Sequence, residues 1–120
     1  MQVAVCCSDE KELRQVCALV NEIFAGEARE DVAAAFPSEE ALWQAFRPGL
    51  FLGAVVGYGD ARGFLCARRL REEDSGCRVI LLDDTARYAI RGIRIHLSDF
   101  LVRPIAEERL RAALERLLSD

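Results

Sequence analysis

Residues 50–56 read Leu-Phe-Leu-Gly-Ala-Val-Val, a run of strand length without a single charged side chain. A continuous apolar run of this kind is typical of a strand that is buried on both faces of a parallel sheet. Three glycines follow closely, at Gly57, Gly59 and Gly63, and indicate a loop directly after the strand. The run therefore predicts a central strand of an α/β fold, with a loop at its carboxyl end.

The segments on either side of this run alternate between strand-like and helix-like apolar spacing. We expect five strands, at residues 2–6, 32–36, 50–56, 78–82 and 100–102. We expect five helices: the first from Ser8-Asp9 to Gly26, the second after Pro37, the third at 64–71, the fourth at 86–91 with its end at Gly92, and the fifth opening at Pro104. Regular alternation predicts a doubly wound five-stranded parallel sheet in the flavodoxin-like order 2-1-3-4-5.

Composition fits one domain, residues 1–120, and narrows its function. The chain is 52% apolar and 30% charged, which is enough to bury a core. Its net charge of −4 argues against nucleic-acid binding by this domain, although fifteen of the sixteen basic residues are Arg. No apolar run approaches the roughly 18 residues of a membrane span, and the amino terminus lacks the basic start of a signal peptide. A cytoplasmic protein without membrane contact is therefore expected.

The five cysteines are expected to be reduced thiols, because their number is odd and no secretion signal precedes them. No C-x-x-C motif occurs, and His96, the one histidine, has no cysteine at zinc-site spacing, so a structural metal is not expected. Cys6 and Cys7 are neighbours in the first strand, where alternation points them to opposite faces of the sheet. A redox pair is therefore the less favoured interpretation of these two residues.

Two segments near the carboxyl end carry a recognisable pattern. Residues 88–92 read Tyr-Ala-Ile-Arg-Gly, and residues 99–105 read Asp-Phe-Leu-Val-Arg-Pro-Ile. Their sequence and spacing resemble the receiver domains of bacterial response regulators, in particular those that precede LytTR-type DNA-binding domains. Residues 63–72 are similar to the third helix of the same family, and residues 1–13 fit without a gap, so the resemblance covers the whole chain.

The resemblance implies a phosphorylation pocket at the carboxyl ends of the strands. Receivers accept a phosphoryl group on an aspartate after strand 3, with Mg²⁺ held by carboxylates, a Thr or Ser after strand 4 and a Lys after strand 5. The corresponding positions here hold Cys7 and Ser8 with Asp9 beyond them, then Val55, Asp83 and Arg103, and the aromatic switch position holds Phe100. Because acceptor and metal ligands are replaced, the resemblance implies a pseudo-receiver without a catalytic residue, metal or cofactor.

The output surface of the family, formed by helix 4, strand 5 and helix 5, is the part of this sequence that resembles it best. We expect an interaction face there, made of Arg87, Ile90, Arg91, Arg94, Asp99, Glu107 and Glu108. Basic residues near helix 4 and acidic residues on helix 5 favour a weak two-fold homodimer, or the docking of another regulatory protein. By resemblance, we expect that a LytTR-type DNA-binding domain can follow this domain in a longer parent chain. The expected role is regulatory, in bacterial signal transduction and transcription, without enzymatic activity.

Two other functions stay open on this fold. A flavodoxin-like FMN protein would need a phosphate loop rich in hydroxyls and glycines after strand 1, where residues 7–10, Cys-Ser-Asp-Glu, offer one hydroxyl. A receiver that is phosphorylated at a non-standard residue could use Ser8 or Asp60.

Asp83 and Arg103 follow strands 4 and 5, which are expected to be neighbours in the sheet. We therefore predict an ion pair between them that fills the emptied pocket, with Asp9 as another candidate partner of Arg103. Asp84 suits the cap of the next helix, because Asp is favoured at that position by about 1 kcal/mol.

Overall fold

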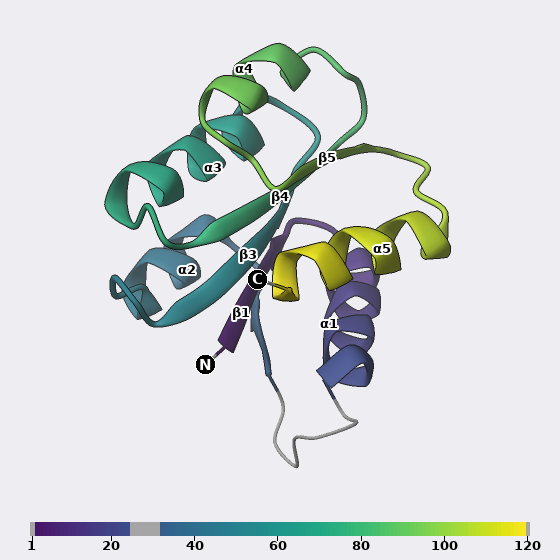
Figure 1. Cartoon of the computed structure of the whole chain (residues 1–120), viewed down its shortest axis with the longest axis horizontal. Coiled ribbons are helices and arrows are strands. Elements are labelled where there is room, and N and C mark those ends of the chain that lie inside the picture. The colour runs from purple at the N-terminus through teal and green to yellow at the C-terminus, as the bar shows by residue number, and fades with distance from the viewer. Residues whose placement is uncertain (1, 25–31, 120) are drawn as a thin grey trace.

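The computed structural model describes residues 2–24 and 32–119, and Figure 1 shows how strands and helices alternate along the chain. The strands are β1 (Gln2–Cys7), β2 (Ala33–Phe36), β3 (Phe51–Gly57), β4 (Arg78–Asp83) and β5 (Asp99–Val102). The helices are α1 (Glu10–Phe24), α2 (Glu39–Ala45), α3 (Ala61–Glu73), α4 (Ala89–Arg94) and α5 (Glu107–Leu118). Every strand and helix expected from the sequence is therefore present.

The five strands form one parallel sheet in the order β2-β1-β3-β4-β5. This order confirms the doubly wound, flavodoxin-like topology predicted from the sequence. Within β3 every residue except Leu52 is buried, as its continuous apolar run predicts. Because all strands run in the same direction, their carboxyl ends meet at one edge of the sheet.

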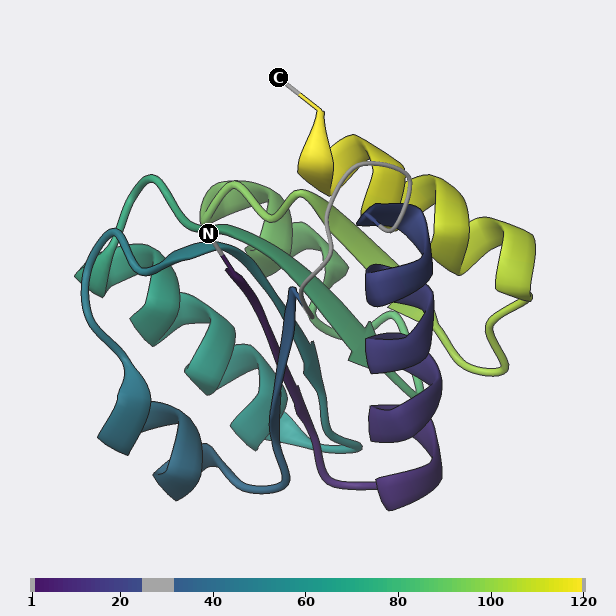
Figure 2. The ribbon, with the colours of Figure 1, turned by 90° about the horizontal axis from the view of Figure 1, so that it is seen from below.

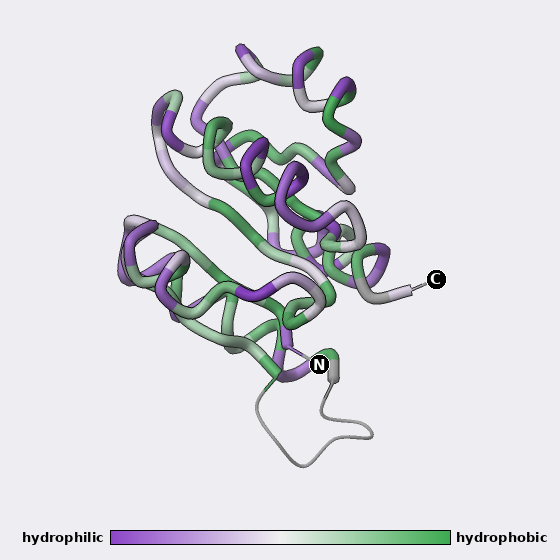
Figure 3. The backbone as a smooth tube through the Cα atoms, turned by 90° about the vertical axis from the view of Figure 1, so that its left-hand side faces the viewer, coloured by the Kyte–Doolittle hydropathy of each residue, from purple (hydrophilic) through white to green (hydrophobic). Residues whose placement is uncertain are grey.

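Helices cover both faces of the sheet, α1 and α5 on one face and α2, α3 and α4 on the other (Figures 1 and 2). Cys6 packs into the core beneath α2 and α3, whereas Cys7 packs into the core beneath α1 and α5. The prediction that these neighbours face opposite ways is confirmed. The apolar stretches of the chain concentrate on the strands, and polar stretches recur on the helices (Figure 3). No described helix is long and apolar enough to cross a membrane.

The third helix begins earlier than expected. Ala61 is its first residue, and the side chain of Asp60 caps it by accepting the backbone N–H of Arg62 at 2.9 Å. Gly63 therefore lies in the first turn of α3, and its assignment to a loop is wrong. A Cβ at Gly63 would lie 3.3 Å from side-chain atoms of both Leu81 and Tyr58, so the glycine allows α3 to pack closely on the sheet.

The fourth helix also differs from the prediction, because Gly92 lies inside it and does not end it. A Cβ at Gly92 would come within 2.6 Å of Leu97, so close packing explains this glycine. The helix is ended by His96, whose φ of 59° makes it the one non-glycine residue with positive φ in the described part of the chain. Leu97 N–H then donates to the carbonyl oxygen of Gly92 at 3.0 Å, as in a helix C-terminal motif.

Two further expectations concern helix ends. α5 begins at Glu107 and not at Pro104, because Ala106 is still extended, with φ −65° and ψ 142°. Ile105 therefore lies before the helix, although it still packs against the core beneath α1 and α5. Gly26, the predicted end of the first helix, lies outside the described residues.

Candidate functional site

The carboxyl ends of β1, β3, β4 and β5 meet at the edge where the sequence predicts a pocket. β1 ends at Cys7, which pairs with Gly57 at the end of β3, and β4 ends at Asp83, which pairs with Val102 of β5. Arg103 follows β5 directly, and its backbone N–H donates to the carbonyl oxygen of Asp83 at 2.8 Å. The edge therefore brings together residues that are far apart in the sequence, as expected for this topology.

The guanidinium of Arg103 lies at the centre of this edge. Its Nε donates to Oε2 of Glu12 at 2.8 Å and its Nη2 to Oε1 of Glu12 at 2.7 Å, which makes a bidentate ion pair. Its Nη1 donates to the carbonyl oxygen of Tyr58 at 2.9 Å and to Oδ1 of Asp84 at 3.2 Å. The side chains of Arg103 and Glu12 are only 23% and 17% exposed. We call this set of residues, with Gly57, the Arg103 pocket.

The electrostatics of the Arg103 pocket hold the arginine in its charged form. The hydrogen bonds to Glu12 raise the pKa of the Arg103 guanidinium above its ordinary value, and Asp84 adds to this effect. Because four of the five guanidinium N–H groups already have partners, little of the donor capacity remains. The pocket is therefore closed by a largely buried ion pair.

Glu12 reaches Arg103 because of the way α1 begins. Asp9 caps the helix, with its Oδ2 accepting the backbone N–H of Glu12 at 2.9 Å. This cap holds Glu12 in the first turn of α1, close to the end of β1. The sequence analysis did not single out Glu12, although the spacing Asp9-x-x-Glu12 is that of a capping box. In this fold the glutamate binds Arg103.

The residue at the carboxyl end of β3 is Gly57, and the assignment of Val55 to the pocket is wrong. Val55 lies two residues before the strand end, is fully buried, and packs into the core beneath α1 and α5. A Cβ on Gly57 would lie 2.7 Å from Oε1 of Glu12, 3.0 Å from Sγ of Cys7 and 3.1 Å from Nη2 of Arg103. The ion pair therefore occupies the space that a side chain at the strand end would need.

Asp83 does not form the predicted side-chain ion pair with Arg103. Asp83 is only 2% exposed, and its Oδ1 accepts the backbone N–H of Asp84 at 2.7 Å and Nη2 of Arg87 at 3.3 Å. The side chain turns toward Arg87, four residues further along, because Glu12 already binds Arg103. Asp84 does not cap the next helix either, since α4 begins only at Ala89 and has no side-chain cap.

The carboxylates at this edge do not suit a divalent cation such as Mg²⁺. Asp9 serves as a helix cap, and the carboxylates of Glu12 and Asp84 both bind the guanidinium of Arg103. A hard cation needs several oxygen ligands that are free to turn toward it, and here a permanent positive charge lies between two of the candidates. The described residues contain no group of three or more metal-ligating side chains.

The other candidate phosphorylation residues have local roles. Ser8 is exposed in the turn between β1 and α1. Asp60 caps α3, and its side-chain hydrogen bond with Arg62 lowers the pKa of its carboxyl group. Cys7 is buried, and this burial, together with the nearby Glu12, raises the pKa of its thiol. Cys7 therefore remains a protonated core residue.

The switch position lies in a packed aromatic cluster. Phe100 is partly buried and packs, like Tyr88 and Leu97, against the core beneath α2 and α3. Tyr88 stacks on Phe64 with ring centroids 5.0 Å apart and an angle of 11° between the rings. The aromatic side chains on this side of β5 are therefore turned inward and held by their neighbours.

The face formed by α4 and β5 presents exposed apolar and basic side chains together. Ile90 and Ile93 of α4 are 70% and 74% exposed, and Val102 of β5 is 41% exposed. Arg91 and Arg94 lie on the same short helix and are exposed. Neither forms an ion pair within the described part of the chain. We call these five residues the α4–β5 face.

Two residues that we assigned to the interaction face, Arg87 and Asp99, bind other side chains, and Glu107 lies on another side of α5. Arg87 turns toward Asp83 at the edge of the sheet, as described above. The side chain of Asp99 is 18% exposed and pairs with Arg116 of α5. Glu107 faces α1. Glu108 is exposed in the first turn of α5.

The side of α5 next to β5 is therefore basic. Arg109 lines a shallow hollow together with Val102, and Arg116, seven residues later, lies on the same side of the helix and binds Asp99. Among the acidic residues expected at the interaction face, Glu107 lies on another side of α5. Helical spacing explains the error, because Glu107 points to the opposite side of α5 from Arg109.

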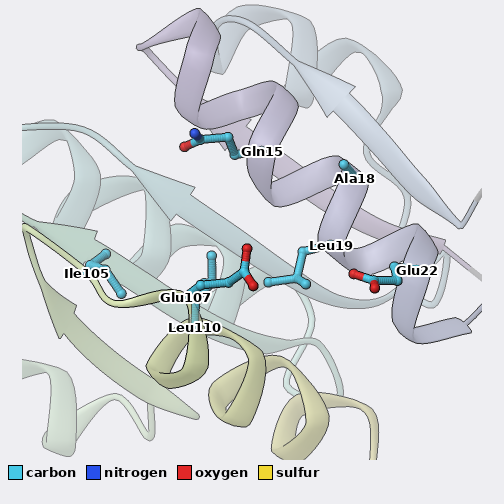
Figure 4. Close-up of a pocket in the computed structure, with 7 residues that line it drawn as sticks. All are labelled: Gln15, Ala18, Leu19, Glu22, Ile105, Glu107 and Leu110. Carbon is cyan, nitrogen blue, oxygen red and sulfur yellow. The ribbon is translucent and has the colours of Figure 1, made fainter.

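Glu107 borders a groove between α1 and α5, shown in Figure 4. The groove has a volume of about 370 Å³ and is lined by Gln15, Ala18, Leu19, Glu22, Ile105, Glu107 and Leu110. Arg111 of α5 binds Glu22 of α1 at 3.0 Å, which ties the two helices together. Gln15, Ile105 and Leu110 also line a neighbouring hollow of about 600 Å³ that includes Glu12, Asp84 and Arg103. The groove therefore leads to the Arg103 pocket.

No protein-family model matches the chain, and no curated protein is significantly similar to it in sequence. Solved structures do match it. The response regulator DrrB of Thermotoga maritima, an OmpR/PhoB homologue, has 21% identity and a TM-score of 0.78, and the match covers 98% of this chain and 52% of DrrB. The non-phosphorylated HemR receiver domain of Leptospira biflexa has 17% identity and a TM-score of 0.81, over 99% of this chain and 94% of that domain.

A response regulator receiver protein from Pseudoalteromonas atlantica has 13% identity and a TM-score of 0.77, over 98% of this chain and 97% of that one. The chain thus spans about half the length of DrrB and nearly all of the other two proteins. Likeness at these identities establishes the architecture alone. The chain has the flavodoxin-like receiver fold, and its structural neighbours include receiver domains of response regulators.

Proposed function

We propose that this chain is a phosphorylation-independent receiver-like domain that acts as a protein-interaction module in bacterial signal transduction. The observation that carries the proposal is the Arg103 pocket. Glycine occupies the carboxyl end of β3, and the adjoining space is filled by the ion pair between Arg103 and Glu12. A receiver needs an aspartate and a metal at this place, so the geometry supports a domain that works without phosphoryl transfer.

The packing around the switch position supports the same proposal. In receivers, phosphorylation draws the Thr or Ser after strand 4 toward the phosphate and lets the switch aromatic turn inward. Here Asp83 occupies that position and is held by Arg87, and Phe100 already packs against the core. A ligand shifts a conformational equilibrium only by binding one state better than the other. Without a phosphate to do so, we propose that the α4–β5 face stays in one conformation.

Incubation with acetyl phosphate and Mg²⁺, followed by intact-mass spectrometry, tests the first part of the proposal. We expect no stable gain of one phosphoryl group. A gain would overturn the proposal, and the Ser8→Ala and Asp60→Asn variants would then show whether either residue is a non-standard acceptor. These two variants therefore test the alternative that a non-standard residue accepts the phosphoryl group.

The interaction surface that we propose is the α4–β5 face. Exposed Ile90 and Ile93 give it an apolar centre, and Arg91 and Arg94 surround that centre without an ion-pair partner in the described part of the chain. Arg109 extends the basic rim onto α5. Charge complementarity governs which partner such a rim accepts. The arrangement therefore favours a partner with acidic side chains, and self-association is expected to be weak because two copies would bring arginines together.

A charge-reversed copy of the domain can serve as the acidic partner. Sedimentation velocity would compare wild type, the Arg91→Glu/Arg94→Glu variant, and an equimolar mixture of the two. We expect the mixture to associate more strongly than either protein alone, because the variant keeps Ile90 and Ile93 but reverses the rim. Arg68→Glu, a charge reversal at an exposed residue of α3, is the control and should leave the wild-type behaviour unchanged.

An absence of association in all three samples at high concentration would contradict the proposed face.

A role in transcription, with a LytTR-type DNA-binding domain in a longer parent chain, belongs to the same proposal and rests on the resemblance of residues 88–92 and 99–105. A flavodoxin-like cofactor role has less support, because the turn after β1 contributes its aspartate to a helix cap and has Ser8 as its one hydroxyl.

A further inference from the structure

Another hollow, of about 540 Å³, lies at the amino end of the sheet, away from the Arg103 pocket. It is formed by the end of α3, the turn into β4, the turn after α4 and the end of α5. Three arginines, one histidine, three serines and a glycine line it, and no acidic residue is among them. In a chain with a net charge of −4, such a lining is unexpected. We call this the amino-end hollow.

Arg71, at the end of α3, is held in the hollow by neutral acceptors. Its Nε donates to the carbonyl oxygen of Ile95 at 3.0 Å, and its Nη1 donates to those of Ser75 and Cys77 at 2.8 and 2.7 Å. Three of its five N–H groups are therefore engaged, and those bonds fix the guanidinium in place. The positive charge meets no carboxylate within ion-pair distance among the described residues.

Arg78, the first residue of β4, is held in the same way. Its Nη1 donates to the carbonyl oxygens of Leu117 and Ser119 at the end of α5, and its Nε and Nη2 remain. It likewise forms no ion pair with the described residues. Arg116, one turn earlier on α5, pairs with Asp99 through one nitrogen. The hollow thus holds two guanidinium charges without a carboxylate partner and one that is partly neutralised.

His96 is the second unusual feature of the hollow. It adopts a φ of 59° at the end of α4, a conformation that is unfavourable for a non-glycine residue. Glycine is the ordinary residue at this point of a helix C-terminal motif. A strained backbone position that is filled by a polar side chain is a reason to look for a function. His96 is exposed and its side chain adds another N–H donor to the lining of the hollow.

We propose that the amino-end hollow binds a small anion that carries phosphoryl groups. Guanidinium groups donate in a planar fork that matches the oxygens of a phosphoryl group, and the hydroxyls of Ser75 and Ser98 add neutral donors at the rim. The arginines are already oriented by their bonds to carbonyl oxygens, so little side-chain entropy is lost when an anion binds. This inference is independent of the proposed function, since it concerns the opposite end of the sheet.

One electrostatic effect opposes binding at this place. The carboxyl ends of α3 and α5 lie at the hollow, and each carries a partial negative charge of roughly half an elementary unit. Arg78 donates to the carbonyl oxygen of Leu117 at the end of α5, and Arg71 donates to that of Ile95 at the end of α4, so the two arginines offset the charge at these two helix ends. The carboxylates of Asp99, which binds Arg116, and of Asp74, whose Oδ1 accepts the backbone N–H of Gly76 at 3.0 Å, also oppose binding. The groups that remain for an anion are Arg71 and Arg78, which form no ion pair with the described residues.

Isothermal titration calorimetry of the whole chain at constant ionic strength tests the proposal, with inorganic pyrophosphate as the probe. We expect saturable one-site binding with a Kd on the order of 0.1–1 mM. Inorganic phosphate should bind more weakly because it reaches fewer donors. Citrate, a carboxylate anion of similar charge, should bind about tenfold more weakly than pyrophosphate, since its flexible arms fit the arginine forks less well. Equal binding of citrate would overturn the assignment to phosphoryl groups.

Two variants connect the binding to the hollow. Arg116→Gln should weaken pyrophosphate binding about tenfold, whereas Arg94→Gln, which removes the same charge from the α4–β5 face, should leave it unchanged. His96→Gly should weaken binding and at the same time raise the melting temperature by about 4 °C, because it removes the backbone strain. A loss of affinity with a gain of stability cannot come from unfolding.

Two results would overturn the proposal. One is the absence of saturable heat at pyrophosphate concentrations of about 10 mM. The other is an equal loss of affinity in Arg116→Gln and Arg94→Gln, which would mean that pyrophosphate responds to the overall charge and not to this hollow.

Discussion

The two ends of the sheet hold their arginines in opposite ways. At the carboxyl end, Arg103 lies between the carboxylates of Glu12 and Asp84 in a pocket that is mostly shielded from water. At the amino end, Arg71 and Arg78 donate to carbonyl oxygens and border an open hollow. Removing one partner of a paired and shielded charge is costly, because the other charge is then left without compensation. An arginine that is fixed by neutral acceptors keeps its charge available to an external anion.

The largest effect is expected from placing the missing aspartate into the carboxyl-end pocket. Gly57→Asp would put a Cβ 2.7 Å from Oε1 of Glu12 and a second carboxylate next to the first. We expect a loss of about 3 kcal/mol or more in the free energy of unfolding, from crowding and from like-charge repulsion. Urea denaturation measures it, and Gly57→Ala isolates the crowding. A Gly57→Asp variant as stable as wild type would mean that the ion pair moves aside easily.

Removing the arginine from the same pocket is expected to cost less. Arg103→Met leaves Glu12 in a shielded place without a partner, which should lower the free energy of unfolding by about 2 kcal/mol, below the range of fully buried pairs. Adding Glu12→Gln should recover part of the loss, so a double-mutant cycle measures the coupling. A coupling energy near zero would show that the pair contributes nothing to stability.

A smaller effect is expected at the amino end. Arg78→Met removes hydrogen bonds to the carbonyl oxygens of Leu117 and Ser119 but leaves no buried charge behind. We expect a loss of about 1 kcal/mol in the free energy of unfolding, the usual range for such bonds. The comparison between the two ends predicts that Arg103→Met is the more damaging variant. The reverse order in the same denaturation assay would remove the basis of that comparison.

The smallest effect concerns pH at the cap of α3. Arg62 lowers the pKa of Asp60 in the folded state, so the cap contributes stability above the ordinary carboxyl pKa of about 3.9. This contribution is lost as the pH falls through the lowered folded value. Asp60→Asn keeps a good capping side chain without the charge. Wild type should therefore be slightly more stable than the variant at pH 6, and the difference should vanish in acid; a constant difference across this range would contradict the assignment.

Most of the fold could be predicted because its apolar periodicity is strong. The continuous run at residues 50–56 and the alternation around it gave the sheet order, which depends on the number and type of segments more than on their bounds. The predicted bounds of two helices were wrong because a glycine can either end a helix or allow a helix to pack closely. Gly63 and Gly92 indicate breaks in a sequence, yet both lie inside helices where a Cβ would meet Leu81 or Leu97.

The site was predictable in its location but not in its contacts. The resemblance implies Val55 as the acceptor position, but Val55 lies two residues before the end of β3 at Gly57. The apolar run ends at Gly57 in the sequence, and this end would have placed the acceptor position at Gly57 and not at Val55. The partner of Arg103 was not predictable, because a long side chain can reach several acids, and the selection of Glu12 depends on where α1 begins at the end of β1.

The place of β1 between β2 and β3 also bears on how the sheet can be assembled. β2 and β3 flank β1 on its two sides, β4 adds to β3, and β5 adds to β4. Each strand that leaves the ribosome therefore finds its neighbour already synthesised, and no strand has to be inserted between two others. Domains generally fold as units, and in this strand order the sheet can be completed by additions at its edges alone. The last strand to arrive is β5, which carries Val102 of the α4–β5 face.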